Sequence, residues 1–180
     1  EQDVDRVIKR FLIGWGRMQR ILGEKRAPEW KNKIANQIRS NSQKFDDLKT
    51  KDLSDVELGN FESDIKDLFE SFKKALGDTW VGAAKVLHLI CPNFFPPWDN
   101  KIAGAVIEEI KRKYKTKLKV EKLSGEDYYR FMQEIQNFIR KYEGLLSDLA
   151  SKYEKSRVKI VDDCFWYATQ RPLLLFFEGK

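Results

Sequence analysis

The amino-acid sequence predicts an all-α fold, a single compact bundle-like domain of six to eight helices that spans residues 1–180. Apolar residues recur every three or four positions in several separate segments, as they do on the buried face of a helix. The alternation typical of a strand is confined to a short stretch at residues 116–120. A chain of 180 residues also suits one domain with a substantial core.

Two helices are expected at the start of the chain. Residues 4–22 carry an apolar side chain at nearly every turn, and Gly23 follows them. Pro28 suits the first turn of a second helix because its fixed φ is helical and a first-turn amide needs no partner within the helix. That helix would bury Trp30, Ile34 and Ile38.

A polar segment and a third helix come next. We expect residues 40–52 to form a loop or a frayed helix end. Ser54 and Glu57 have the spacing of a capping box, which would begin a helix that Gly77 ends. The apolar face of this helix would consist of Phe61, Ile65, Leu68, Phe69, Phe72 and Leu76.

The middle of the chain holds most of the chemistry. Residues 80–91 are apolar on all sides, which indicates a short buried helix ended by Pro92. Residues 93–98 would form a turn whose two phenylalanines and one tryptophan fill the core. Asp99 is then a natural N-cap for a helix over residues 102–114.

The remaining elements are also helical. Ser124 and Asp127 fit a second capping box, followed by a long apolar stripe over residues 128–149. A last helix is expected over residues 157–169, before Pro172. The predicted core unites residues from four segments, namely Phe61, Phe69, Leu87, Phe95, Trp98, Ile135 and Phe138.

Residues 78–109 resemble the helix-hairpin-helix DNA glycosylases in the order of their features. A glycine-bearing hairpin at Val81-Gly82 precedes a helix with Lys85 near its start, a Pro-rich turn, and Asp99 at the start of the next helix. In that family the hairpin amides hold a DNA phosphate, and a lysine attacks C1′ of the sugar in bifunctional members. An aspartate stabilises charge and activates the nucleophile. The resemblance therefore implies a helix-hairpin-helix-like core, a phosphate contact at Gly82, and Lys85 and Asp99 as catalytic residues.

A longer resemblance carries no activity. W-G-R-M at residues 15–18, K-V-L-H at residues 85–88 and P-N-F-F-P-P-W-D at residues 92–99 resemble a group of uncharacterised prokaryotic all-helical proteins. Members of that group share W-G-R-M and K-x-L-H…P-x-x-F…W-D segments. This resemblance implies a helical fold alone.

Each candidate also has a structural interpretation. Asp99 could serve only as a helix cap, and Lys85 could bury its stem while its amine reaches water. An amine among apolar side chains would instead have a lowered pKa, as a Schiff-base nucleophile requires. His88 lies one turn after Lys85 and is either a hydrogen-bonded core residue or a supporting group. Arg17 could support the site by pairing with Asp99, or it could bind phosphate.

Residues 111–119 read K-R-K-Y-K-T-K-L-K and hold six basic side chains without an acid. Such a run is either the solvated end of a helix or a surface that neutralises phosphates. With Gly82, the nucleic-acid-binding candidates are Lys111, Arg112, Lys113, Lys115 and Lys117. The formal net charge of +6 permits an anionic partner.

Two functions follow from these patterns. The first is DNA binding through a glycosylase-like core, with duplex or damaged DNA as the partner and an enzymatic activity as an open question. The alternative is a non-catalytic module that binds a protein through the aromatic-rich residues 165–177. Glycine-rich phosphate loops and metal-ligand spacings are missing from the sequence, so we expect neither a cofactor nor a metal.

The sequence also suggests where the protein works. Cys91 and Cys164 are far apart, and we expect them to be reduced thiols in a soluble cytoplasmic protein. The chain shows no signal peptide and no apolar run approaching the roughly 20 residues that cross a bilayer, so we expect no membrane association. A charged fraction of 34%, rich in Lys and Glu, is typical of proteins from thermophiles.

Overall fold

The computed structural model describes residues 6–8, 10, 12, 29–99 and 123–170. The helices of this part of the chain are α2 (Trp30–Ser40), α3 (Ser42–Leu48), the 3₁₀ helix η3 (Leu58–Phe61), α4 (Glu62–Ala75), α5 (Trp80–Ile90), α7 (Gly125–Lys141), α8 (Glu143–Tyr153) and α9 (Arg157–Gln170). These eight helices, with no strand among the described residues, confirm the all-α prediction. Most of the helix predicted over residues 4–22, and the helix predicted after Asp99, lie outside this part.

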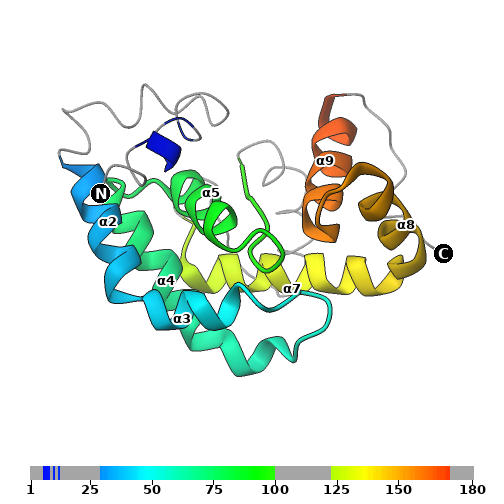
Figure 1. Ribbon diagram of the computed structural model, residues 1–180, viewed down its shortest axis with the longest axis horizontal. Coiled ribbons are helices and arrows are strands. Elements are labelled where there is room, and N and C mark those ends of the chain that lie inside the picture. The colour runs from blue at the N-terminus through cyan, green and yellow to red at the C-terminus, as the bar shows by residue number, and fades with distance from the viewer. Residues whose placement is uncertain (1–5, 9, 11, 13–28, 100–122, 171–180) are drawn as a thin grey trace.

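Helix α7 connects the two ends of the molecule. Figure 1 shows α2, α3, α4 and α5 grouped at one end and the pair α8 and α9 at the other, with α7 running between them. The apolar faces of α4, α5 and α7 meet in one core, because each has an apolar face that water would otherwise cover. Of the predicted core residues, Phe61 and Phe138 are half-buried and the others are buried, namely Phe69, Leu87, Phe95, Trp98 and Ile135.

Two predicted helix ends are confirmed. Gly77 has a φ of 67°, and α4 ends in a Schellman motif in which Asp78 N–H donates to Lys73 O at 2.9 Å. Ser124 and Asp127 form the predicted capping box at the start of α7, with Ser124 N–H donating to Asp127 Oδ2 at 2.8 Å.

Helix α7 begins in close contact with α4. A Cβ atom at Gly125 would lie 2.7 Å from the Lys66 carbonyl oxygen, so only glycine fits at this position without a shift of the backbone. The Gly125 amide donates to Glu70 Oε1 at 2.6 Å, which ties the first turn of α7 to α4. These contacts fix α7 against the core that also holds α5.

Two predictions between residues 40 and 62 are wrong. Residues 40–52 contain α3, which the pair Phe45 and Leu48, three residues apart, anchors in the core. The Ser54–Glu57 capping box does not form, and α4 begins at Glu62, after η3. The Ser54 hydroxyl lies instead 2.8 Å from Asp52 Oδ1 and 2.6 Å from Asp55 Oδ1. Local acceptors compete with helix capping for a serine side chain.

The long stripe over residues 128–149 forms two helices instead of one. The backbone leaves helical geometry at Tyr142, which ends α7, and α8 begins at the next residue. Leu145, which the stripe placed in the core, is therefore 61% exposed. The predicted last helix is confirmed as α9, while Pro172 lies outside the described residues.

Candidate functional site

Helix α5 places two titratable side chains inside the molecule. Its residues are apolar nearly all round, so the helix is buried on all but a narrow strip. Lys85 is 8% exposed and His88, one turn later, is 7% exposed. Both belong to the same side of α5, because residues three apart are neighbours on a helix surface.

The His88 imidazole holds the turn that follows α5. Its Nδ1 atom lies 2.8 Å from the carbonyl oxygen of Phe95. Because a carbonyl only accepts, Nδ1 carries the hydrogen and Nε2 keeps its lone pair. Burial lowers the pKa of His88 to about 4, so the ring is neutral at neutral pH. This confirms the interpretation of His88 as a hydrogen-bonded core residue.

The turn over residues 91–98 is fixed from a second side by α7. The Tyr128 hydroxyl donates to Pro96 O at 2.7 Å. The Trp98 ring stacks on Phe131 with 4.5 Å between centroids and an interplanar angle of 5°. The predicted filling of the core by two phenylalanines and a tryptophan is confirmed, since Phe94, Phe95 and Trp98 are fully buried. Asp99 follows this rigid turn directly and is half-buried.

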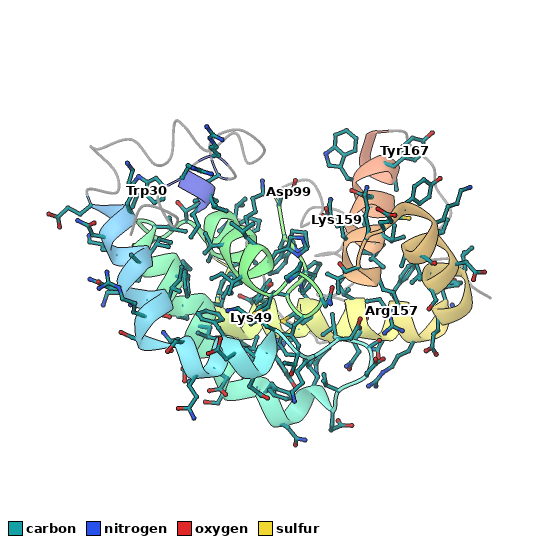
Figure 2. The ribbon with its side chains drawn as sticks, viewed as in Figure 1. Trp30, Lys49, Asp99, Arg157, Lys159 and Tyr167 are labelled. Carbon is teal, nitrogen blue, oxygen red and sulfur yellow. The ribbon has the colours of Figure 1, made fainter. Side chains whose placement is uncertain are left out.

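The structure brings Lys85 and Asp99 together and adds side chains from α9. Burial lowers the pKa of Lys85, the carboxylates of Asp99 and Asp162 oppose that shift, and the Lys159 ammonium adds to it. All three therefore lie within electrostatic reach of the Lys85 amine. Figure 2 shows Asp99 at the end of the turn, with Lys159 on the side of α9 that faces it. We call Lys85, His88, Asp99, Lys159 and Asp162 the Lys85 site.

Helix α9 contributes a lysine paired with two aspartates to this site. Lys159 Nζ lies 2.6 Å from Asp162 Oδ2 and 2.6 Å from Asp163 Oδ1. Burial by itself would lower the pKa of Lys159, but these two carboxylates outweigh it and the pKa rises. The pKa shift of Lys159 therefore favours its charged form, whereas the pKa shift of Lys85 disfavours it.

The Asp162 carboxylate is in an apolar setting. Its side chain is 10% exposed. It borders, with Pro96 and Pro97 of the turn, a narrow apolar gap too small to hold a water molecule. Burial raises the pKa of Asp162 in spite of Lys159, and the nearby Asp99 charge adds to the rise.

Sequence reasoning missed Lys159 and Asp162. Their spacing of three residues is that of an ordinary pair on the surface of a helix, and nothing local relates them to Lys85. Only the packing of α9 beside the turn over residues 91–98 brings them to the site. A lysine followed by two aspartates on an amphipathic helix is a common surface pattern and does not by itself indicate a functional site.

The remaining predicted site residues are placed differently or lie elsewhere. The turn between α4 and α5 consists of residues 76–79, so the hairpin predicted at Val81-Gly82 is wrong in position. Gly82 is buried in the first turn of α5, and a phosphate contact through its amide stays a prediction. The predicted support Arg17 and the basic residues Lys111, Arg112, Lys113, Lys115 and Lys117 lie outside the described residues.

The described residues offer neither a reactive thiol nor a metal site. Burial raises the pKa of Cys91 to about 12, which leaves it a thiol and a poor nucleophile. Cys91 and Cys164 are both free. No group of three or more His, Cys, Asp or Glu side chains among the described residues could hold a metal ion. Of the helices described, none is both long and apolar enough to span a membrane.

A comparison with known protein families, curated proteins and solved structures finds no match to this chain. The function is therefore inferred from the Lys85 site and from the charge of the chain.

Proposed function

We propose that the protein binds DNA and that Lys85 reacts with the sugar as an amine nucleophile, with Asp99 as its carboxylate partner. The observation that carries this proposal is the setting of Lys85. Its amine is buried in an apolar helix, its pKa is lowered, and carboxylates from two other segments lie within electrostatic reach. Titratable groups whose pKa is shifted by burial and by a specific charged partner cluster at functional sites.

The chemistry is simplest at an abasic site, where the open-chain sugar carries an aldehyde at C1′. The neutral amine of Lys85 adds to this carbon, a C–N bond forms, and the carbonyl oxygen leaves as water to give a Schiff base. A lowered pKa favours this step, because only the unprotonated amine carries a lone pair. The Asp99 carboxylate would stabilise the cationic imine that results.

The charge of the chain supports an anionic partner. The net charge is +6, and the basic run over residues 111–119 would neutralise phosphates and release their counterions. Affinity would then come mainly from this run, while Lys85 would contact the sugar carbon and hold no phosphate. Binding and chemistry can thus be tested separately.

The test of the chemistry is a borohydride trap. The protein is incubated with an abasic duplex and borohydride, which reduces the Schiff base to a stable amine and leaves a covalent complex. We expect the complex from the wild type and from Lys152→Gln, an exposed lysine control, and none from Lys85→Gln. Affinity should stay nearly unchanged in Lys85→Gln. A complex that persists in Lys85→Gln would contradict the proposal.

The test of binding is its salt dependence. We expect the double charge reversal Lys113→Glu and Lys115→Glu to weaken binding and to reduce the salt slope by about two phosphate contacts. Failure of the wild type to bind a uracil, oxidised-guanine or abasic duplex at low salt would remove the DNA hypothesis.

A second candidate is a protein-binding module without catalysis. The observation that favours it is a set of exposed apolar side chains on α8 and α9, namely Leu145, Tyr153, Trp166 and Tyr167. Such side chains suit the core of an interface better than a solvated surface. A steep salt slope with DNA separates the two candidates, because an apolar interface releases few counterions.

A further inference from the structure

One face of α9 extends beyond the Lys85 site. Lys159, Asp162, Asp163 and Trp166 have the spacing i, i+3, i+4 and i+7, which places them on one side of a helix. Lys159 and Asp162 belong to the site. Trp166 therefore lies on the side of α9 that faces the site, one turn beyond Asp162.

Trp166 is exposed, unlike the other tryptophans that the structure describes. The adjoining side of α9, next to Asp162, packs into the core through Val158, Val161 and Phe165. Trp166 is 50% exposed, whereas Trp30, Trp80 and Trp98 are at most 8% exposed. Packing in the core therefore accounts for only part of this indole, and half of its surface is exposed.

We propose that Trp166 is a binding residue of the Lys85 site that stacks on a nucleobase extruded from the DNA duplex. This inference rests on the proposed function, because it takes DNA as the ligand. A side chain that reacts at C1′ needs the nucleotide turned out of the helix, and an extruded base is held by stacking on aromatic side chains. Every base has a π-face, so an exposed indole on the side of α9 that faces the site suits any extruded base.

The neighbouring residue provides a matched control. Tyr167 is 49% exposed, close to the value for Trp166, but it is turned about 100° around the helix from it. Figure 2 shows Tyr167 on the side of α9 away from Lys159. Replacing either ring removes exposed aromatic surface from the same turn of the same helix, and only Trp166 shares a side with the site.

The experiment compares two duplexes that differ in one base. The first carries a G·U mismatch, whose uracil is easily extruded, and the second carries a stable abasic analogue in place of that uracil. We expect Trp166→Ala to bind the mismatched duplex about 5- to 150-fold more weakly, the range for loss of one stacked base. Its affinity for the abasic duplex should change by less than about twofold, because no base is present to stack.

The remaining variants complete the test. Trp166→Phe keeps a ring and should retain most of the affinity, and Tyr167→Ala should bind both duplexes like the wild type. The salt slope should stay constant throughout, since stacking releases no counterions. Equal weakening of both duplexes by Trp166→Ala, or an effect no larger than that of Tyr167→Ala, would overturn the inference alone. A wild-type protein that binds neither duplex at low salt would overturn the proposed function, and the inference with it.

Discussion

Two regions of the molecule each fix a turn through polar side chains, and they use different chemistry. In the first, α7 and α9 hold residues 52–56. The Gln136 amide donates to Leu53 O at 2.6 Å, Arg140 donates to further carbonyls of this segment, and Arg157 pairs with its aspartates. We call Gln136, Arg140 and Arg157 the loop anchor. Neither an amide nor a guanidinium changes its charge near neutral pH.

The Lys85 site also holds a turn, but through groups that titrate. His88 donates to the Phe95 carbonyl, and burial lowers its pKa and that of Lys85. At Arg157 burial would also lower the pKa, but Asp52 and Asp55 outweigh it and the pKa rises. The surroundings of Arg157 thus stabilise its charged form, whereas burial destabilises the charged forms of Lys85 and His88. A penalty of this kind is expected where function, and not stability, selects the residue.

The largest expected effect is the loss of stability at low pH that His88 causes. The folded-state pKa of His88 is about 4, below the ordinary histidine value of 6.5, so the unfolded chain binds the proton more readily. Stability from His88 is therefore complete above pH 6.5 and is lost as the pH falls toward 4. The loss should reach about 3 kcal/mol. The measurement is urea unfolding of the wild type and of His88→Asn, which keeps an N–H for the Phe95 carbonyl, between pH 7.5 and 4.

The two curves should diverge as the pH falls, because only the wild type carries the imidazole. Acidic residues titrate in both proteins and cancel in the difference. Parallel curves would show that His88 is not penalised when it becomes charged, and the contrast with the loop anchor would lose its main support.

A smaller effect is expected at the loop anchor. Gln136→Leu keeps the volume but leaves the buried Leu53 carbonyl without its donor, which should cost about 2 kcal/mol. The cost should not vary between pH 5 and 8, in contrast to the His88 effect. Gln133→Leu, half-buried on the same helix, serves as the control and should change stability by less than about 0.5 kcal/mol. A pH-dependent cost for Gln136→Leu would break the comparison.

The smallest expected effect is a pair of stability changes of opposite sign, one in each region. Arg157→Met should lower stability by about 1 kcal/mol, because it removes the guanidinium that pairs with the Asp52 and Asp55 carboxylates. Lys85→Met should raise stability by about 1 kcal/mol at pH 7, because it removes the cost of burying the ammonium. The thermal midpoints of the two variants report these signs.

The Lys85 effect also has its own pH window. Because the folded-state pKa of Lys85 lies below the ordinary lysine value of 10.5, the gain in stability of Lys85→Met is complete below the folded-state pKa. It disappears as the pH rises to 10.5, where the lysine is neutral in the unfolded chain as well. A loss of stability in Lys85→Met would mean that its ion pairs outweigh its burial, and the two regions would then be alike.

Local patterns in the sequence determined much of the fold. The helix α5 follows from apolar residues on every side, and the ends at Gly77 and Ser124 follow from side chains that act within a few residues. Helix α3 was missed because two buried side chains, Phe45 and Leu48, anchor a mostly polar segment. Lys85, His88 and Asp99 could be named as candidates because they lie within one short segment of unusual composition.

Only the tertiary structure decided what surrounds Lys85. The periodicity of α9 shows which of its sides is apolar, but not which partner that side packs against. The contacts of α9 with α7 and with the turn over residues 91–98 set Lys159 and Asp162 beside Lys85 and turn Trp166 to the same side. The physical reason is range: hydrogen bonds of caps and helices join near neighbours, whereas electrostatics and packing join whatever the chain brings into contact.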